Sequence, residues 1–364
     1  MKDKDSCHYY WLDFLKFISM IIVFLCHLRM SFFYDKFGTI HIGRFTLPNY
    51  IFSGNLAVCM FLLISVHLYV KKAVEDESEN VCDFWKLCIK RYIRLFVPAV
   101  VCNLLIFILF VCHLFFNVDA YDVEVPYVNS WFHFSTSVKA FCSMLWADVN
   151  TCLFENGSNP PLWCYNLLFI LPLLAFATVR LVGSKRAILI SFLILPLLLL
   201  HKSYFAVIPL ALISQNVYKL KSMYYKCLWG GVMIFCIILQ MIDVTYQISL
   251  MNKFSVSINM LLATSIFNVL QSICLKERSV FNLRIFYHLN KIGFSIYLLH
   301  MPVICSVGFY LFKITEKLIL AIGTLCIVLI AASVVFHIFI ERKLTNLIFK
   351  FYTENFYKCK KGNA

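Results

Sequence analysis

The chain has 364 residues, of which 61% are hydrophobic, 17% aromatic and only 14% charged. Soluble domains carry roughly 25% charged residues, so the composition excludes an ordinary soluble domain and predicts an integral membrane protein. A formal charge of +14 would favour nucleic-acid binding in a soluble protein, but here the cations cluster between apolar runs, which is typical of membrane topology. We therefore expect the lipid bilayer as a partner and no nucleic acid.

The first apolar run spans Tyr10 to Phe33 and contains three polar groups that a plain membrane anchor does not need. Asp13 and Lys16 lie at its start, and His27 lies near its far end. On a helix, Lys16 and His27 are roughly 16 Å apart along the axis and face nearly the same way. A buried cation and a titratable base on one face indicate a wet cavity or a site. The alternative is that Asp13 and Lys16 mark the membrane interface and His27 is a satisfied interfacial histidine.

Ten apolar stretches are long enough to span a bilayer, most of them near the roughly 20 residues that a helix needs. The fifth and sixth are short and are separated only by Lys202 and Ser203. With the N-terminus inside, the inner segments hold 24 of the 33 Lys and Arg residues and the outer segments hold 8. This excess predicts that both termini are cytoplasmic. The stretches cover about 12–33, 50–70, 95–116, 161–181, 186–201, 204–217, 227–243, 254–274, 290–311 and 318–340.

The longest outer segment, Asn117 to Pro160, combines aromatic rings with carboxylates. Rings stack on the C–H face of a sugar and carboxylates accept hydrogen bonds from its hydroxyls, so this segment favours a sugar ligand. The alternative is an interfacial aromatic belt with a solvated loop. The segment also contains a glycosylation sequon at Asn156. The residues concerned are Asp119, Tyr121, Asp122, Glu124, Tyr127, Trp131, His133, Phe134, Trp146, Asp148 and Glu155.

Two polar groupings interrupt the apolar pattern. The segment Phe84 to Pro98 reads FWKLCIKRYIRLFVP, in which Arg91 and Arg94 share a helix face and suit a phosphate. The alternative is that these cations only flank the third apolar run on its cytoplasmic side, as the positive-inside rule predicts. The segment Leu289 to Val303 reads LNKIGFSIYLLHMPV, whose polar residues and proline indicate a lined cavity rather than a single structural histidine. Its polar residues are Ser295, Tyr297 and His300, followed by Pro302.

The rest of the chain adds few further signals. Residues Met1 to Tyr9 are polar and no small-residue cleavage site follows the first run, so we expect no cleaved signal peptide. There are 16 cysteines but no CxxC pair, and we expect no disulfide framework, no metal and no permanently bound cofactor. No repeat or second soluble domain is visible. We therefore expect a single multi-pass domain over 1–364, with a basic tail at 341–364 along the inner surface.

These segments together resemble the type-3 membrane acyltransferases, bacterial inner-membrane enzymes that O-acylate polysaccharides, lipopolysaccharide, peptidoglycan and related glycans. The opening helix of that family has an arginine, ten residues and a histidine. Lys16 and His27 match this spacing, with lysine in place of arginine. The family's paired-arginine motif is similar to KRYIRLFVP, at Arg91 and Arg94. Its Ser-x-Tyr-Leu-x-His-x-Pro motif is similar to IGFSIYLLHMPV, which ends at Val303.

Three further motifs extend the resemblance over nearly the whole chain. The second-helix motif resembles GNLAVCMFLLIS at 54–65, and the Leu-Trp motif resembles PLWCYNLLFILP at 161–172. The closing Ile-Glu-Arg-Pro motif resembles FIERK at 339–343. The six motifs occur in the family's order. Besides Lys16, the sequence departs from the family at three motif positions, which are Cys59 for a common aspartate, Leu168 for a frequent glutamate and Lys343 for the proline.

The resemblance implies an all-α bundle of about ten transmembrane helices that acts as an O-acyltransferase in the bacterial inner membrane. It implies acetyl-CoA, or another acyl-CoA, as co-substrate and a hydroxyl of a cell-envelope or exported glycan, or of its lipid-linked precursor, as acceptor. A neutral imidazole at His27 could deprotonate that hydroxyl or take the acyl group covalently. We expect catalysis by His27, Lys16 and Asp13, and binding of CoA phosphates by Lys90, Arg91 and Arg94. The expected cavity and acceptor residues are Ser295, Tyr297, His300, Trp163 and Glu341.

Two other classes of protein fit part of the pattern. Intramembrane His, Lys and Asp also suit a transporter or flippase for a glycan or small solute. The sequence shows no paired discontinuous helices or inverted halves, which such a transporter would favour. A catalytically inactive scaffold is the third alternative, because Lys16 and Leu168 depart from the family's pattern.

Overall fold

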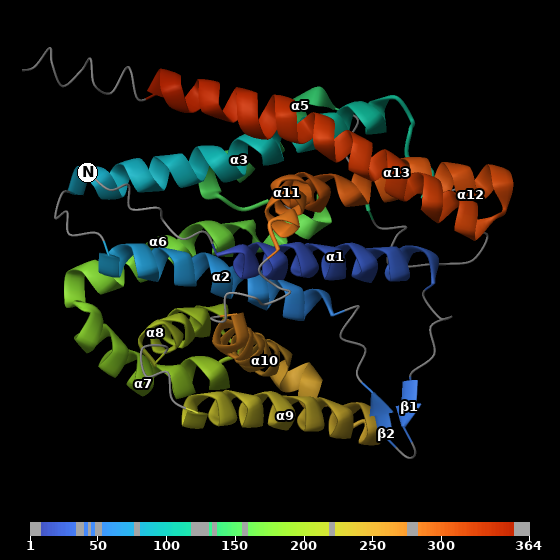
Figure 1. Cartoon of the computed structure of the whole chain (residues 1–364). Coiled ribbons are helices and arrows are strands. Elements are labelled where there is room, and N and C mark those ends of the chain that lie inside the picture. Colours follow the sequence, from blue (N-terminus) through green and yellow to red (C-terminus); the bar gives the residue numbers. More distant parts are fainter. Residues whose placement is uncertain are drawn as a thin grey trace, which may run out of the picture. The chain divides into compact units, whose positions relative to one another are not determined.

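The computed structural model describes residues 9–33, 40–42, 45–47, 53–75, 81–117, 131–132, 137–154, 159–217, 223–274 and 283–352. Nearly all of these residues are helical (Figure 1). A short antiparallel hairpin pairs β1 (Ile40–Ile42) with β2 (Phe45–Leu47). The α-helices are α1 (Tyr10–Phe32), α2 (Gly54–Glu75), α3 (Val81–Val111), α5 (Val138–Thr151), α6 (Tyr165–Val182), α7 (Ser184–Leu200), α8 (Val207–Val217), α9 (Met223–Tyr246), α10 (Leu250–Cys274), α11 (Ile285–Val303), α12 (Phe309–Thr315) and α13 (Leu318–Phe336).

Four short helical turns complete the described chain. Two are 3₁₀ turns, η2 (Pro160–Cys164) and η3 (Tyr204–Ala206). Two are π-helical, η6 (Ile304–Gly308) and η7 (His337–Leu344). π-Helical segments inside α-helices are frequent at functional sites, and both of these adjoin or contain residues that the sequence singled out.

The predicted fold class is confirmed: the protein is an all-α multi-pass membrane protein. In the described part of the chain, 8 helices are long and apolar enough to cross a membrane. Each of the ten predicted stretches coincides with a helix, and the two short ones are α7 and α8. The hairpin was not predicted, because strands of three residues are too short to show an alternating pattern. The cytoplasmic placement of both termini stays a prediction.

The described chain divides into two compact units that interleave along the sequence, and the single domain expected over 1–364 stays a prediction. Unit 1 comprises residues 1–26, 35–77 and 170–293. In it α10 packs against α9 and α2, and α2 packs against α8 (Figure 1). Buried polar side chains join these helices, as is usual where lipid removes most of the hydrophobic driving force. Tyr225 donates to Asn268 at 2.7 Å, and Asn268 donates to Ser214 at 3.0 Å.

Unit 2 comprises residues 27–34, 78–169 and 294–364. Its α3 packs against α5 and η7, and α13 packs against α12 and η6. Gly308, in η6, allows one of these contacts, because an added Cβ there would overlap Leu325 and lie 3.2 Å from Phe32. Through Phe32, the end of α1 therefore also lies close to η6.

Four of the described helices contain an internal proline. A proline has no N–H, so the carbonyl four residues earlier loses its helical hydrogen bond. Inside a membrane no water replaces that bond, and a side chain must supply it. For Pro172 and Pro302 the freed carbonyls belong to Leu168 and Leu298. Both accept hydrogen bonds from side chains in unit 2.

Candidate functional site

Two histidines and a tryptophan from distant parts of the sequence meet in unit 2. The ring centroids of His27, on α1, and His300, on α11, lie 5.1 Å apart with an interplanar angle of 37°. Trp131 approaches the His27 ring edge-on, with a centroid distance of 5.6 Å. His300 is buried and His27 is partly exposed. The structure therefore joins two predicted site residues and adds Trp131, which the sequence placed only among many aromatic residues of the outer segment.

The hydrogen bonds of His300 define which of its nitrogens can act as a base. Its Nδ1 lies 2.7 Å from the carbonyl oxygen of Tyr297 and 3.3 Å from that of Ile296. A carbonyl only accepts, so in the neutral ring Nδ1 donates and Nε2 keeps the lone pair. Among the described residues this buried Nε2 has no hydrogen-bond partner. His300 therefore presents an unused acceptor in the part of the structure where the His27 ring lies.

Tyr297 holds this turn of α11 in place. Its hydroxyl donates to the carbonyl of Pro161 in η2 and lies 3.3 Å from the sulfur of Cys164. Its ring stacks on Tyr165 at a centroid distance of 6.4 Å and lies 6.0 Å from that of His300. The hydroxyl thus already binds protein groups within one helical turn of His300, and a cavity or acceptor role for Tyr297 stays a prediction.

Asn159 compensates for the proline in α11. Pro302 leaves the carbonyl of Leu298 without a helical partner, and the Asn159 amide donates to that oxygen at 3.1 Å. The thiol of Cys102 donates to the same oxygen at 3.3 Å. Both side chains are buried. This connection fixes the backbone two residues before His300. The sequence signalled the free carbonyl through Pro302 but gave no sign that Asn159 would meet it.

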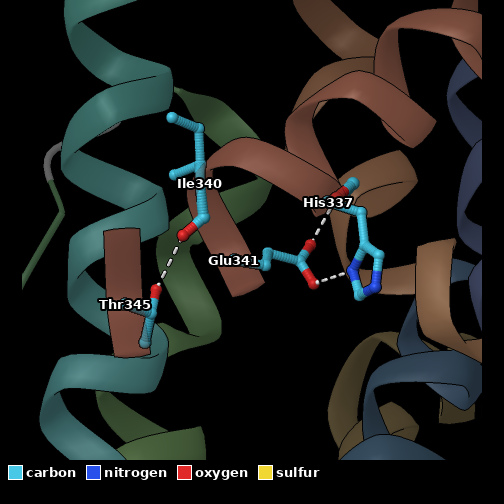
Figure 2. Close-up of polar contacts among 5 residues, drawn as sticks. His337, Ile340, Glu341 and Thr345 are labelled. Carbon is cyan, nitrogen blue, oxygen red and sulfur yellow. Dashed lines mark hydrogen bonds and ion pairs between the residues drawn. The ribbon is translucent and has the colours of Figure 1, made fainter. Parts of the chain in front are cut away.

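Ser295 and Glu341, two predicted cavity residues, bind each other. Ser295 donates to one carboxylate oxygen of Glu341. The Nδ1 of His337 lies 2.9 Å from the other carboxylate oxygen (Figure 2). Glu341 and His337 both lie in the π-helical turn η7, and Thr345, directly after it, donates from its hydroxyl to the carbonyl of Ile340 at 3.0 Å (Figure 2). The turn therefore brings a half-buried carboxylate to α11. A cavity role for Ser295 and Glu341 stays a prediction, and His337 was missed.

The three cations predicted to bind CoA have different surroundings on α3. Arg91 donates through Nε, at 3.0 Å, and through Nη2 to the carbonyl oxygen of Leu168. Lys90 and Arg94 are exposed, four residues apart on the helix. The Lys90 ammonium lies 5.8 Å from the Phe349 ring, and Arg94 is near enough to Glu341 to interact electrostatically with it. Arg91 therefore binds backbone, whereas Lys90 and Arg94 are accessible to an anion.

Asp13 and Lys16 belong to unit 1, whereas the histidine pair belongs to unit 2. Asp13 is buried, accepts a hydrogen bond from Asn290 at 2.9 Å and lies 3.8 Å from the Lys16 ammonium. Both residues are on α1, which continues without interruption to His27. The carboxylate thus ties α1 to α11 as well as pairing with Lys16. The catalytic roles of Asp13 and Lys16 stay predictions, and Asn290 was missed.

The outer segment can be followed only in part. Trp163, in η2, is 40% exposed, and Trp146, on α5, is 71% exposed, so both indoles are accessible to a ligand. The backbone of Phe116 donates to Cys305 at 2.9 Å, and the Asn117 amide donates to the Trp131 carbonyl at 3.4 Å, which connects the segment to the histidine pair. Other predicted residues lie outside the described parts of the chain, namely Asp119, Tyr121, Asp122, Glu124, Tyr127, His133, Phe134, Glu155, Asn156 and the tail beyond Tyr352.

Fold and site together define a multi-pass helical membrane protein in which one unit contains a histidine pair and part of a helix with an internal proline. The acyltransferase domain of the acyltransferase 3 family matches residues 9–338, and the chain belongs to that family. The resemblance seen in the sequence motifs is thereby confirmed. The protein is an enzyme that transfers acyl groups other than amino-acyl groups. No curated protein and no solved structure matches the chain.

Proposed function

We propose that the protein transfers acetyl from acetyl-CoA to a hydroxyl of a cell-envelope or exported glycan. Membership of the acyltransferase family supports acyl transfer, and the single structural observation that carries the proposal is the His27–His300 pair. A partly exposed imidazole beside a buried one suits a reaction in which a proton must leave a hydroxyl. Candidate acceptors are O-antigen, capsule, exopolysaccharide and their lipid-linked precursors.

In this reaction the acceptor hydroxyl oxygen attacks the thioester carbonyl carbon. A C–O bond forms, the C–S bond breaks, and CoA leaves as a thiolate. His27 takes the hydroxyl proton during the attack and returns it to the thiolate, so the enzyme ends unchanged. General-base catalysis of this kind contributes roughly 10²–10⁴-fold to the rate. We assign His27 as the base because it is the more exposed ring of the pair.

The donor would bind through its phosphates to the exposed cations of α3. Lys90 and Arg94 suit this role because neither donates a hydrogen bond that the structure assigns to another described residue. Arg91 contributes by holding α6 through Leu168. We keep Lys16 and Asp13 as catalytic residues on the helix that carries His27, with Asp13 orienting the lysine at 3.8 Å. Acetyl-CoA is a co-substrate, not a bound cofactor.

We place the enzyme in a bacterial inner membrane with both termini cytoplasmic, which would put the α3 cations on the side where CoA is made. The test has two parts. Deletion of the gene should remove an acetyl group from a surface glycan, measured by mass analysis, and the purified protein should transfer labelled acetyl from acetyl-CoA to that glycan. Loss of the whole glycan from the surface, with no acetyl change, would instead support the alternative function of a transporter or flippase.

A further inference from the structure

We infer that His300 is a positioning residue for His27: its Nε2 is the acceptor to which the N–H of the His27 ring donates once the two rings align for the reaction, and this fixes which His27 nitrogen is free to act as the base. The inference rests on the proposed function. It adds a second imidazole to the reaction, in the role that a carboxylate has beside many catalytic histidines.

The geometry of the two rings supports this contact. An N–H···N hydrogen bond of about 3 Å between two imidazoles places their centroids roughly 5 Å apart. The observed centroid distance is 5.1 Å, with a tilt of 37°. The Nε2 of His300 makes no hydrogen bond within the described residues, so it remains available. Catalytic hydrogen bonds are often misaligned without substrate and tighten in the complex.

His300 is constrained to offer an acceptor rather than a donor. Its Nδ1 proton is committed to the carbonyl of Tyr297 at 2.7 Å. The backbone around it is fixed by Asn159 on Leu298 and by Tyr297 on Pro161. The other ring beside His27 is Trp131, whose indole only donates and cannot accept the His27 proton. A buried acceptor without a partner is costly, which favours the same pairing.

The proton balance follows from this arrangement. The acceptor hydroxyl proton moves to the unprotonated nitrogen of His27 as the new C–O bond forms and the C–S bond breaks. The other His27 nitrogen stays protonated and donates to His300 throughout, without transferring its proton. The imidazolium at His27 then protonates the CoA thiolate. Both histidines return to their starting forms.

Two substitutions separate a positioning role from a structural one. His300→Asn can keep a donor to the Tyr297 carbonyl but removes the acceptor at Nε2, whereas His300→Gln can keep an acceptor there and loses that donor. We expect kcat to fall by about 10–100-fold in the asparagine variant and less in the glutamine variant, with KM for acetyl-CoA within about twofold. A purely structural role predicts the opposite order, and that order would overturn the inference.

Combination with His27→Ala gives a second criterion. Because His300 acts through His27, the double variant His27→Ala/His300→Asn should be no slower than His27→Ala alone. Independent, multiplying losses would overturn the inference. The matched control is His67→Asn, another buried histidine, which lies on α2 in unit 1 and should leave kcat unchanged.

A measurement without acyl transfer separates this inference from the proposed function. In the purified protein, nitrogen-15 NMR of the imidazole rings should show an unprotonated Nε2 at His300. The His27 signals should shift in His300→Asn but not in His67→Asn. Unchanged His27 signals in folded His300→Asn would overturn the inference even if the enzyme transfers acetyl. Shifted signals in a protein that transfers no acetyl would support the contact and refute the proposed function.

Discussion

The hydrogen bonds from Arg91 to Leu168 lead to a quantitative prediction. Pro172 cannot donate to the Leu168 carbonyl, and Arg91 donates to it twice. Arg91→Ala removes both donors and leaves a partly buried carbonyl without a partner. Hydrogen bonds to a charged group contribute about 1.5–3 kcal/mol each, and an unsatisfied buried acceptor costs about 1–3 kcal/mol. Because both bonds end on one oxygen, we expect a loss of about 2–3 kcal/mol in the free energy of unfolding.

Pro172→Ala supplies the internal test. An alanine at 172 has an N–H that can close the helical bond to Leu168. In that background Arg91→Ala should therefore cost at least about 1 kcal/mol less than in the original chain. The measurement is thermal unfolding of the four purified proteins in one detergent. An equal cost in both backgrounds would refute the reasoning, since it would show that Arg91 does not act through this carbonyl.

Arg94→Ala is the matched control. It removes the same charge from the same helix three residues away, but Arg94 is exposed and has no hydrogen bond that the structure assigns within the described residues. Its unfolding free energy should change by less than about 0.5 kcal/mol. A comparable loss in both variants would mean that the charge on α3, rather than the bond to Leu168, stabilises the protein.

The remaining predictions concern the proposed reaction. Arg94→Ala should weaken CoA binding by about 10-fold or more in a calorimetric titration, because one charge-assisted phosphate contact is lost. Unchanged affinity would show that Arg94 does not bind CoA and reflects only the membrane topology. His27→Ala should lower the rate of transfer of labelled acetyl by roughly 10²–10⁴-fold while acetyl-CoA still binds; full activity would remove His27 from the mechanism and make His300 the next base to test. Lys16→Arg should retain activity, since the family's opening helix has arginine there, and an inactive but folded variant would contradict that match. Tags at both termini should be shielded in intact cells while residues 117–160 are accessible; labelling of one terminus only would contradict the predicted topology.

The apolar runs predicted the helices well because a membrane requires every spanning backbone group to be bonded within its own segment. The errors in the predicted helices lie outside the apolar runs. The predicted start at 95 lies well after the observed start of α3 at Val81, since hydropathy detects only the part in lipid. The helix α5 was missed although Phe141, Leu145 and Asp148 are buried at helical spacing. This helical spacing of buried residues could have predicted α5 from the sequence.

The candidate site was predicted only where residues of the site share a motif. His300 and Tyr297 belong to one turn of α11, and their spacing places them together. Trp131 and His337 come from other segments, and no local pattern predicts their contacts with His27 and Glu341. Sequence spacing thus identifies which residues one element presents, whereas tertiary packing decides what they meet.

Two prolines illustrate what the sequence predicts about hydrogen bonding and what only tertiary packing decides. Pro172 and Pro302 are visible in the sequence, and each predicts one carbonyl that lacks its helical bond. The membrane makes a donor necessary, but many buried amides, hydroxyls and guanidinium groups could supply it. The fold selects Arg91 in one case and Asn159 in the other. Arg91 uses two of its donors on Leu168, which leaves fewer for a phosphate. The proposed donor site therefore relies on Lys90 and Arg94, and binding of CoA by all three cations stays a prediction.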